Sequence, residues 1–163
     1  MRIKSELKVF GFLFAIFLII TLSNVIPKEE KFPDFLSDNS SVDLYSGEKV
    51  IFSFSIDDCS ICLKSLEILN QLSINNSQKV EIVGIFAASE SYVFEKIKKY
   101  YHLNFPLLWD RENIVKSTFG KNIMHKPILF LLKDGIILKK AFIGVKSDRK
   151  KVKEIFDYLK DRS

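Results

Sequence analysis

Apolar residues recur along this chain in two patterns: short continuous runs, and stripes spaced three or four residues apart. The runs are rich in Val, Ile and Phe, as buried strands are, whereas the stripes are typical of amphipathic helices. Together they predict an α/β domain. The predicted strands are 50–56, 79–86, 105–109, 127–133 and 136–143, with two short strands at 33–36 and 42–44; the predicted helices are 63–72, 90–101, 112–119 and 147–160.

Turn and capping residues divide these elements. Asp134-Gly135 lies between the last two strands and predicts a two-residue hairpin. Gly120 is expected to end the third helix, and Ser89 and Ser147 are expected to cap the helices that follow them. The strand, helix and strand over 50–86 have the length of a right-handed parallel crossover.

The first residues form a separate segment. Val9 to Ile26 is a run of eighteen residues without a charge, close to the ~20 that cross a bilayer. Basic residues precede it, which favours a cytoplasmic N-terminus. A cleaved signal peptide is the alternative, although its apolar region would be shorter, about 7–15 residues. We therefore expect a cytoplasmic tail at 1–8, a transmembrane anchor or uncleaved signal at 9–26, a tether at 27–32 and one domain at 33–163.

The net charge is mild. The chain of 163 residues carries +5, of which residues 1–8 contribute +2. The densest basic run, 146–153, lies on a predicted helix among acidic residues, as a solvated helix face does. The charge therefore gives no support to nucleic-acid binding.

The two cysteines of the chain, Cys59 and Cys62, stand between the first predicted strand and helix 63–72. Cys62, Leu66 and Leu69 share one apolar stripe, so Cys62 is expected to face inward and Cys59 outward. The unpaired N–H groups at a helix N-terminus stabilise an anion and lower the pKa of a thiol. Cys59 is the candidate nucleophile, and Cys62 is the candidate resolving thiol.

The same spacing also occurs in zinc sites and in inert structural disulfides. A zinc site needs a second pair of ligands, but His102 and His125 are far apart and not in a zinc-finger spacing. We expect no metal site. On the motif alone, a static structural disulfide remains an alternative.

The order of elements resembles the thioredoxin superfamily over about residues 33–160. Three stretches carry the resemblance: a strand running into Cys-Ser-Ile-Cys62, then Lys126-Pro127 with the hairpin after it, and a terminal helix after Phe142-Ile143-Gly144. Three features make the chain similar to the membrane-anchored TlpA/ResA-like thiol-disulfide oxidoreductases: Pro33-Asp34-Phe35, Ser46-Gly47, and an inserted helix and strand that end in 105–110. The resemblance implies a thioredoxin-like fold with a central mixed sheet flanked by helices.

The resemblance also assigns roles to residues. Cys59 matches the attacking cysteine, Cys62 the resolving cysteine, and Pro127 the family's cis-proline. A cis bond would turn the backbone of Lys126 toward an extended substrate. The alternative for Pro127 is an ordinary proline at the start of a strand.

The chain departs from the family beside its thiols. Asp57-Asp58 stands where an aromatic residue usually precedes the first cysteine, and a carboxylate there disfavours the thiolate. Asp58 and Lys126 are the expected modulators of the thiol pKa, the lysine offsetting the aspartate. Ser53 and Ser65 stand where the family often has a buried acid. Glu67 is expected on the exposed face of its helix.

These residues predict an extracytoplasmic thiol-disulfide oxidoreductase that acts through Cys59 and Cys62 without a dissociable cofactor, and the resemblance implies that it reduces protein disulfides. Its expected partners are cysteine-containing proteins, a thiol electron donor and the membrane through 9–26. Its expected location is the bacterial cytoplasmic membrane, single-pass, with the domain facing the periplasm or cell exterior. A binding module with a structural disulfide is the alternative. A peroxidase fits less well because Ile56 and Asp57 replace the peroxidase threonine, and a metal carrier fits less well because the Cys-x-x-x-Cys spacing of the related copper carriers is absent.

Overall fold

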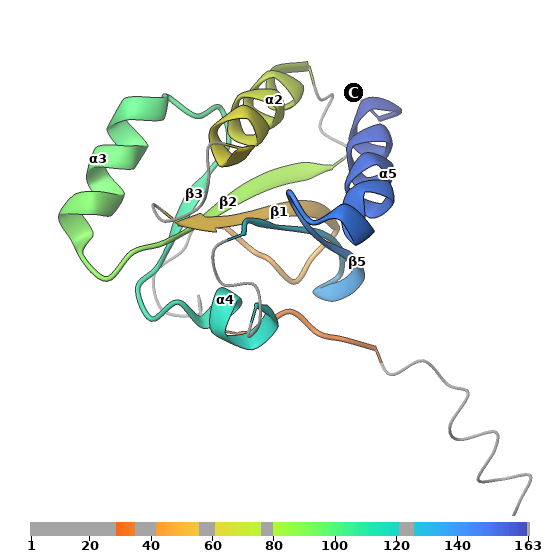
Figure 1. Ribbon diagram of the computed structural model, residues 1–163, viewed down its shortest axis with the longest axis horizontal. Helices are drawn as coiled ribbons and strands as arrows, with labels where there is room; N and C mark the ends of the chain where they lie inside the picture. Colours follow the sequence, from red (N-terminus) through yellow and green to blue (C-terminus); the bar gives the residue numbers. More distant parts are fainter. Residues whose placement is uncertain (1–28, 35–41, 56–60, 76–79, 121–125, 163) are drawn as a thin grey trace, which may run out of the picture.

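A five-stranded mixed sheet forms the centre of the domain, in a computed structural model that describes residues 29–34, 42–55, 61–75, 80–120 and 126–162 (Figure 1). The strands lie in the order β3-β2-β1-β4-β5. Their bounds are Glu48–Ser55 for β1, Glu81–Ala87 for β2, Leu107–Asp110 for β3, Ile128–Lys133 for β4 and Ile136–Phe142 for β5.

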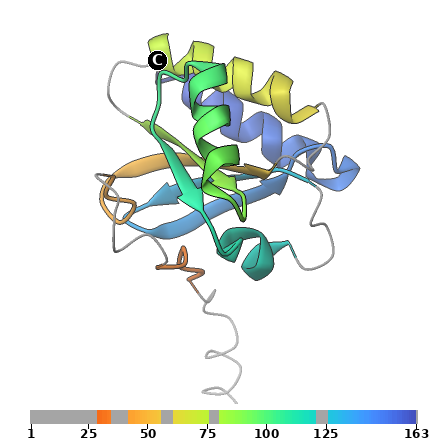
Figure 2. The same cartoon turned by 90° about the vertical axis from the view of Figure 1, so that its left-hand side faces the viewer.

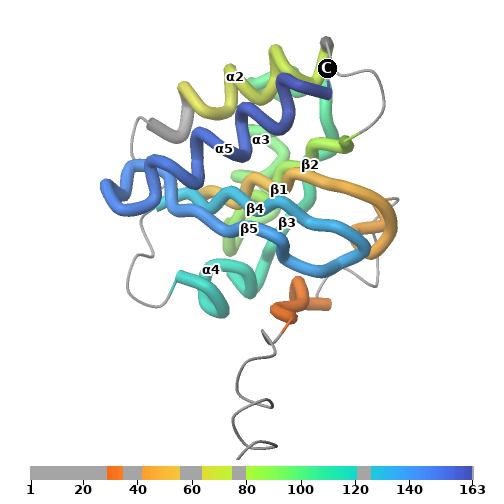
Figure 3. The backbone as a smooth tube through the Cα atoms, turned by 90° about the vertical axis from the view of Figure 1, so that its right-hand side faces the viewer, coloured from red at the N-terminus to blue at the C-terminus, as the bar shows by residue number. Residues whose placement is uncertain are grey.

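Helices cover both faces of this sheet. The helices are α2 (Ile61–Asn75), α3 (Ser91–Tyr101), α4 (Ile114–Phe119) and α5 (Arg149–Lys160), with a 3₁₀ turn η1 at Lys146–Asp148. Figures 2 and 3 show α2, α3 and α5 on one side of the sheet and α4 on the other. None of the helices within these described ranges is both long and apolar enough to cross a bilayer. The anchor predicted at 9–26 lies outside them.

The pairing of the strands confirms the mixed sheet. β1 pairs in parallel with β2, and β2 in parallel with β3. β1 and β5 both pair antiparallel with β4. β1 is central and buried on both faces, which explains why its sequence is a nearly continuous apolar run. Val50, Phe52 and Phe54 pack toward α2 and α5, while Ile51 packs in the second core with α4.

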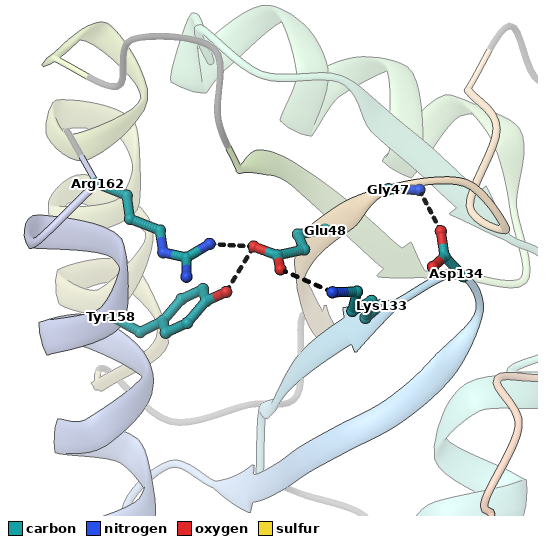
Figure 4. A network of polar contacts seen from close by, with 6 residues as sticks. All are labelled: Gly47, Glu48, Lys133, Asp134, Tyr158 and Arg162. Carbon is teal, nitrogen blue, oxygen red and sulfur yellow. Dashed lines mark hydrogen bonds and ion pairs between the residues drawn. The ribbon is translucent and has the colours of Figure 1, made fainter.

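The hairpin between β4 and β5 follows its sequence signal. Asp134 and Gly135 both have positive φ, 50° and 75°, as a two-residue turn with two left-handed positions requires. A Cβ on Gly135 would lie 2.8 Å from the Tyr45 ring, so the position also needs a glycine for space. The Asp134 carboxylate accepts the Gly47 N–H at 2.8 Å, which joins the hairpin to the start of β1 (Figure 4).

The two predicted serine caps are wrong, whereas Gly120 does end α4. The N-cap of α3 is Glu90, whose carbonyl accepts the Val93 N–H, so the helix starts one residue after the predicted position. At α5 the turn η1 comes first and the N-cap is Asp148. The Asp148 carboxylate accepts the Phe142 N–H at 2.9 Å, so this contact with β5 sets the start of α5.

The strand predicted at 42–44 is also wrong, because a turn occupies this place. The Asp43 carboxylate accepts the Tyr45 N–H at 2.8 Å, a local bond that competes with strand pairing. Pro33 and Asp34 are not in a strand either, and the rest of the predicted 33–36 lies outside the described residues.

The end of the predicted tether belongs to the domain. Lys31 forms an isolated bridge with Ile136, the Phe32 N–H donates to the Gly135 carbonyl at 2.9 Å, and Phe32 is buried in the core beside α4. Aromatic burial explains the attachment, since a buried Phe contributes about 1.5–3 kcal/mol. Residues 30–32 therefore extend the sheet edge.

Asp110 starts helix α4. It is fully buried at the end of β3, and its two carboxylate oxygens accept the N–H groups of Ile114 at 2.7 Å and Val115 at 3.0 Å. The N-cap residue itself, Asn113, makes no side-chain capping bond. The carboxylate therefore satisfies two of the N–H groups that a helix start leaves unpaired.

Glu48 joins the start of β1 to the C-terminal helix. Its carboxylate accepts the Tyr158 hydroxyl at 2.5 Å, pairs with Arg162, and lies 3.6 Å from the Lys133 ammonium (Figure 4). The Tyr158 hydrogen bond, with the Arg162 and Lys133 charges, holds the pKa of Glu48 below its ordinary value. The cluster fixes the end of α5 against the sheet.

Replacing Asp110 by Ala tests the start of α4. Two buried N–H groups would lose their acceptors, so we expect a loss of about 1–2 kcal/mol in the free energy of unfolding, measured by urea titration. Asp110→Asn keeps one oxygen and should lose less. Glu112→Ala removes an exposed carboxylate two residues away and serves as control. An Asp110→Ala protein as stable as this control would contradict the assignment.

The Glu48 cluster predicts a pH dependence of stability. Since the folded pKa of Glu48 is depressed, its contribution is present above the ordinary value of 4.5 and is lost as the pH falls through the folded pKa. Glu48→Gln should be less stable than the parent at pH 7 by at most about 1 kcal/mol, because the carboxylate is partly solvated. The urea midpoints of the two proteins should draw together as the pH falls below the ordinary value of 4.5 and through the folded pKa. A difference in urea midpoint that persists at low pH, or the lack of a difference at pH 7, would contradict a lowered pKa of Glu48 in the folded protein.

Candidate functional site

The carboxyl ends of the three parallel strands meet at one edge of the sheet. The register pairs Ser55 with Ala87 and Ala87 with Asp110, so the last residues of β1, β2 and β3 lie in one row. In open α/β sheets such an edge is where ligands and reacting groups gather. This row is therefore the place to look for a site.

The cysteine motif begins directly after this row. β1 ends at Ser55 and α2 begins at Ile61, so Cys62 is the second residue of the helix. Residues 56–60, which contain Asp58 and Cys59, lie outside the described residues, as does the side chain of Cys62. The first turn of α2 contains no acidic residue that would compete for its N–H groups. The predicted helix exists but begins two residues earlier than the predicted 63, so that Cys62 lies inside it, while the roles of the two thiols and of Asp58 stay predictions.

Lys126 and Pro127 come to the same edge from the other side of β1. Ile128, the first residue of β4, pairs with Ser53, so the antiparallel register continues with Pro127 and Lys126 toward the end of β1. Pro127 is buried and its carbonyl accepts the Ile143 N–H at 2.9 Å, while Lys126 is half-buried. Their predicted position beside the strand that leads into the motif fits this register.

The expected cis bond before Pro127 is wrong. No peptide bond between described residues is cis, and Lys126–Pro127 is one of these bonds. The trans form is ordinarily favoured by about 0.5–1 kcal/mol, and a proline just before a strand needs no N–H for the ladder. The trans bond fits the alternative of a proline at the start of a strand, while the substrate-binding role of Lys126 and Pro127 stays a prediction.

The two serines at the places of a buried acid do lie in the core. Ser53 is fully buried and Ser65 is 6% exposed. The Ser53 hydroxyl oxygen has no hydrogen-bond partner within the described part of the chain. Glu67 is exposed, as expected from its place on α2. Neither serine supplies a carboxylate to accept a proton from Cys62.

Two charged residues at this edge were missed from the sequence. Lys116 of α4 is only 1% exposed, and its ammonium donates to the Ser55 hydroxyl at 2.8 Å. Asp110 lies at the end of the same row, and burial raises its pKa although the Ile114 and Val115 N–H groups act against the shift. A six-residue helix is too short to show which face is apolar, so nothing in the sequence marked Lys116 as buried.

Across the ranges that the structure describes, no three His, Cys, Asp or Glu side chains come together in an arrangement that could hold a metal ion. Among the described residues, the groups at this edge are hydroxyls, the ammonium groups of Lys116 and Lys126 and the buried carboxyl group of Asp110, next to the start of the cysteine helix.

Comparison with known proteins gives a family and a relative. The Redoxin family model matches residues 27–159. The thiol-disulfide oxidoreductase ResA of Geobacillus thermodenitrificans is 28% identical over 101 residues, which are 61% of this chain and 57% of ResA. The match thus spans a little over half the length of that relative.

Solved structures share the fold. The thiol:disulfide interchange protein DsbE from Chlorobium tepidum aligns with a TM-score of 0.60 at 18% identity, over 82% of this chain and 98% of DsbE. A peroxiredoxin-like protein from Aquifex aeolicus aligns with a TM-score of 0.53 at 11% identity, over 72% and 73% of the two chains. These likenesses confirm the thioredoxin-like α/β fold with its mixed sheet. The chain belongs to the Redoxin family, as a member of the thioredoxin superfamily similar to the TlpA/ResA-like thiol-disulfide oxidoreductases.

Proposed function

We propose that this protein reduces disulfide bonds of other proteins through Cys59 and Cys62. One observation carries the proposal: the chain's two cysteines stand where β1, the central strand, ends and α2 begins, at the edge where all three parallel strands end. The unpaired N–H groups of that helix start favour a thiolate over a thiol. Family membership supports the same chemistry.

The reaction is a two-step exchange. The Cys59 thiolate attacks one sulfur of a substrate disulfide, which forms a mixed disulfide and releases the other sulfur as a thiolate. The Cys62 thiolate then attacks the Cys59 sulfur, releases the second substrate thiolate and leaves a Cys59–Cys62 disulfide. Two electrons pass to the substrate, whose thiolates take up two protons. A partner dithiol returns the pair to the reduced state by the reverse exchange.

The substrates in this proposal are extended, cysteine-containing segments of other proteins. Lys126 and Pro127 lead into β4 beside the end of β1, where a substrate backbone would lie along the sheet edge next to the motif. Because the peptide bond before Pro127 is trans, this docking would depend on the position of the start of β4 and not on a cis peptide.

The proposal places the domain outside the cytoplasm. The uncharged run at 9–26, with basic residues before it, supports a single anchor in the bacterial cytoplasmic membrane with the N-terminus inside. A disulfide persists in the periplasm or at the cell exterior, where such a domain would find oxidised protein substrates.

Serine variants of each cysteine test the mechanism in an insulin-disulfide reduction assay with a dithiol as electron donor. Cys59→Ser removes the nucleophile and should reduce the rate to the uncatalysed background. Cys62→Ser should also lose turnover but accumulate a mixed disulfide with insulin, visible on a non-reducing gel, because the resolving thiol is missing. Ser60→Ala changes the motif without removing sulfur and is expected to keep activity. Full activity in both cysteine variants would refute the mechanism.

A further inference from the structure

Residues 29–34, the first that the structure describes, are bonded to β5 and to the turn before it. The Ile137 N–H donates to the Glu30 carbonyl at 2.8 Å, and the Phe32 N–H donates to the Gly135 carbonyl at 2.9 Å. The Glu30 carboxylate also pairs with the Lys140 ammonium at 2.8 Å. Main-chain bonds on both sides of an antiparallel bridge give the segment the geometry of a short strand. This part of the chain therefore moves together with the sheet.

Aromatic side chains hold the same segment. Phe32 is 3% exposed, and its ring centroid lies 5.3 Å from that of Phe130 in β4 and 6.2 Å from that of Phe119 in α4. The Tyr45 hydroxyl donates to the Pro33 carbonyl at 3.1 Å. Detaching the segment would expose a buried aromatic ring to water, which is unfavourable. Residues 30–34 are consequently a fixed part of the domain.

The segment lies on one particular side of the sheet. Figures 2 and 3 show residues 29–34 on the side of α4, whereas α2, α3 and α5 cover the other side. The packing agrees, because Phe32 belongs to the same core cluster as Ile51 of β1 and Val115 of α4. The chain therefore enters the domain on the face that α4 covers.

The distance from this segment to the proposed anchor is short. Pro27 and Lys28 alone stand between Ile26, the last residue of the uncharged run, and Glu29. From Ile26 to Glu29 the chain spans at most about 11 Å, while the headgroups add about 5–7 Å outside the hydrocarbon core. A domain of this size is about 35 Å across. The chain is thus too short to pass around the domain, so the layer of α2, α3 and α5 cannot face the lipid.

We propose that residues 30–34 are a rigid joint that holds the α4 face of the domain on the membrane surface, with lipid headgroups as the partner of that face. The inference rests on the anchor in the proposed function, and goes beyond it by assigning an orientation and a contact surface. The row of strand ends before the cysteine motif lies at an edge of the sheet. This orientation therefore leaves the row open to substrates from the side.

Charge attraction is not the cause of this contact. The described charged residues of the segment and of the turn before α4 have both signs: Glu29, Glu30, Lys31, Asp34, Arg111 and Glu112. A surface that binds anionic lipid by charge would carry a cluster of Lys and Arg instead. The orientation follows from the joint and the chain length, so we expect it to be the same on zwitterionic and on anionic vesicles.

Quenching of a fluorophore by lipid headgroups tests the orientation. The full chain, with Cys59→Ser and Cys62→Ser, is reconstituted in phosphatidylcholine vesicles that contain a lipid with a nitroxide on its headgroup. A single new cysteine carries the fluorophore: Thr118→Cys on the exposed side of α4, or Lys98→Cys on the exposed side of α3. A headgroup nitroxide quenches only at short range. We therefore expect the α4 label to be quenched several-fold more than the α3 label.

Release of the joint should remove this difference. Phe32→Ala takes away the ring that holds the segment in the core, and Lys31→Ala, at an exposed neighbour, is the matched control. Phe32→Ala should lower quenching of the α4 label toward that of the α3 label, and Lys31→Ala should leave the difference unchanged.

A longer connection tests the same claim without touching the domain. A Gly-Ser linker of about twenty residues between Lys28 and Glu29 spans about 25 Å and lets the domain turn. Both labels should then be quenched to the same extent. If Phe32→Ala does not fold, judged by circular dichroism, the linker protein decides alone.

Other results would overturn the inference. Equal quenching of the two labels without the linker would mean that no face is held on the lipid. A difference that survives the linker would mean that the α4 face binds lipid by its own affinity, without the joint. Quenching of the α4 label that falls as the protein-to-lipid ratio rises would indicate a second copy of the chain on this face.

Alkaline extraction of the vesicles separates this inference from the proposed function. A chain that is washed off refutes the proposed anchor and this orientation together. A chain that stays in the vesicles with equal quenching of both labels overturns the orientation alone. Insulin reduction by the parent chain tests the thiol chemistry independently of both results.

Discussion

The register of three parallel strands is the constraint on which the site depends. Because β1, β2 and β3 end in one row, the chain leaves the buried central strand at the same edge where α2 begins. Burial of β1 on both faces fixes this register, since a slip of one residue would turn Phe52 and Phe54 to the wrong core. The position of the cysteine motif therefore follows from the hydrophobic packing of β1. The polar groups at the edge, from Ser55 to Asp110, are held by the same packing.

The parts of the fold that sequence predicts are those with a local cause. The Asp134-Gly135 turn needs two left-handed residues, and Gly120 ends a helix, so both can be recognised from a few positions. The order of strands and helices follows from apolar periodicity, and the mixed sheet follows from that order together with the family resemblance. The placement of Lys126 and Pro127 beside β1 came from the family resemblance, and the register of β4 agrees with it.

The parts that sequence does not predict depend on contacts between distant segments. Asp148 rather than Ser147 is the N-cap residue of α5; it makes no side-chain capping bond to the helix, and its carboxylate accepts an N–H from β5 instead. Phe32 packs in the core although it stands among polar residues in the sequence. Its N–H donates to the Gly135 carbonyl, and its ring contacts the rings of Phe119 and Phe130. The burial of Lys116 cannot be predicted from apolar periodicity, because α4 has only six residues. Each miss is a tertiary contact that overrides a local preference.

Hydrophobic packing positions a pair of thiols, and the helix start and the charges around it set the chemistry of that pair. The central claim is that the pair cycles between dithiol and disulfide rather than serving as a permanent bridge. Equilibration of the protein with glutathione and dithiothreitol buffers measures this directly through the reduction potential of Cys59–Cys62. The account predicts a potential in the range of about −270 to −120 mV found for thioredoxin-like catalysts. A potential below about −300 mV, typical of structural disulfides, would contradict it.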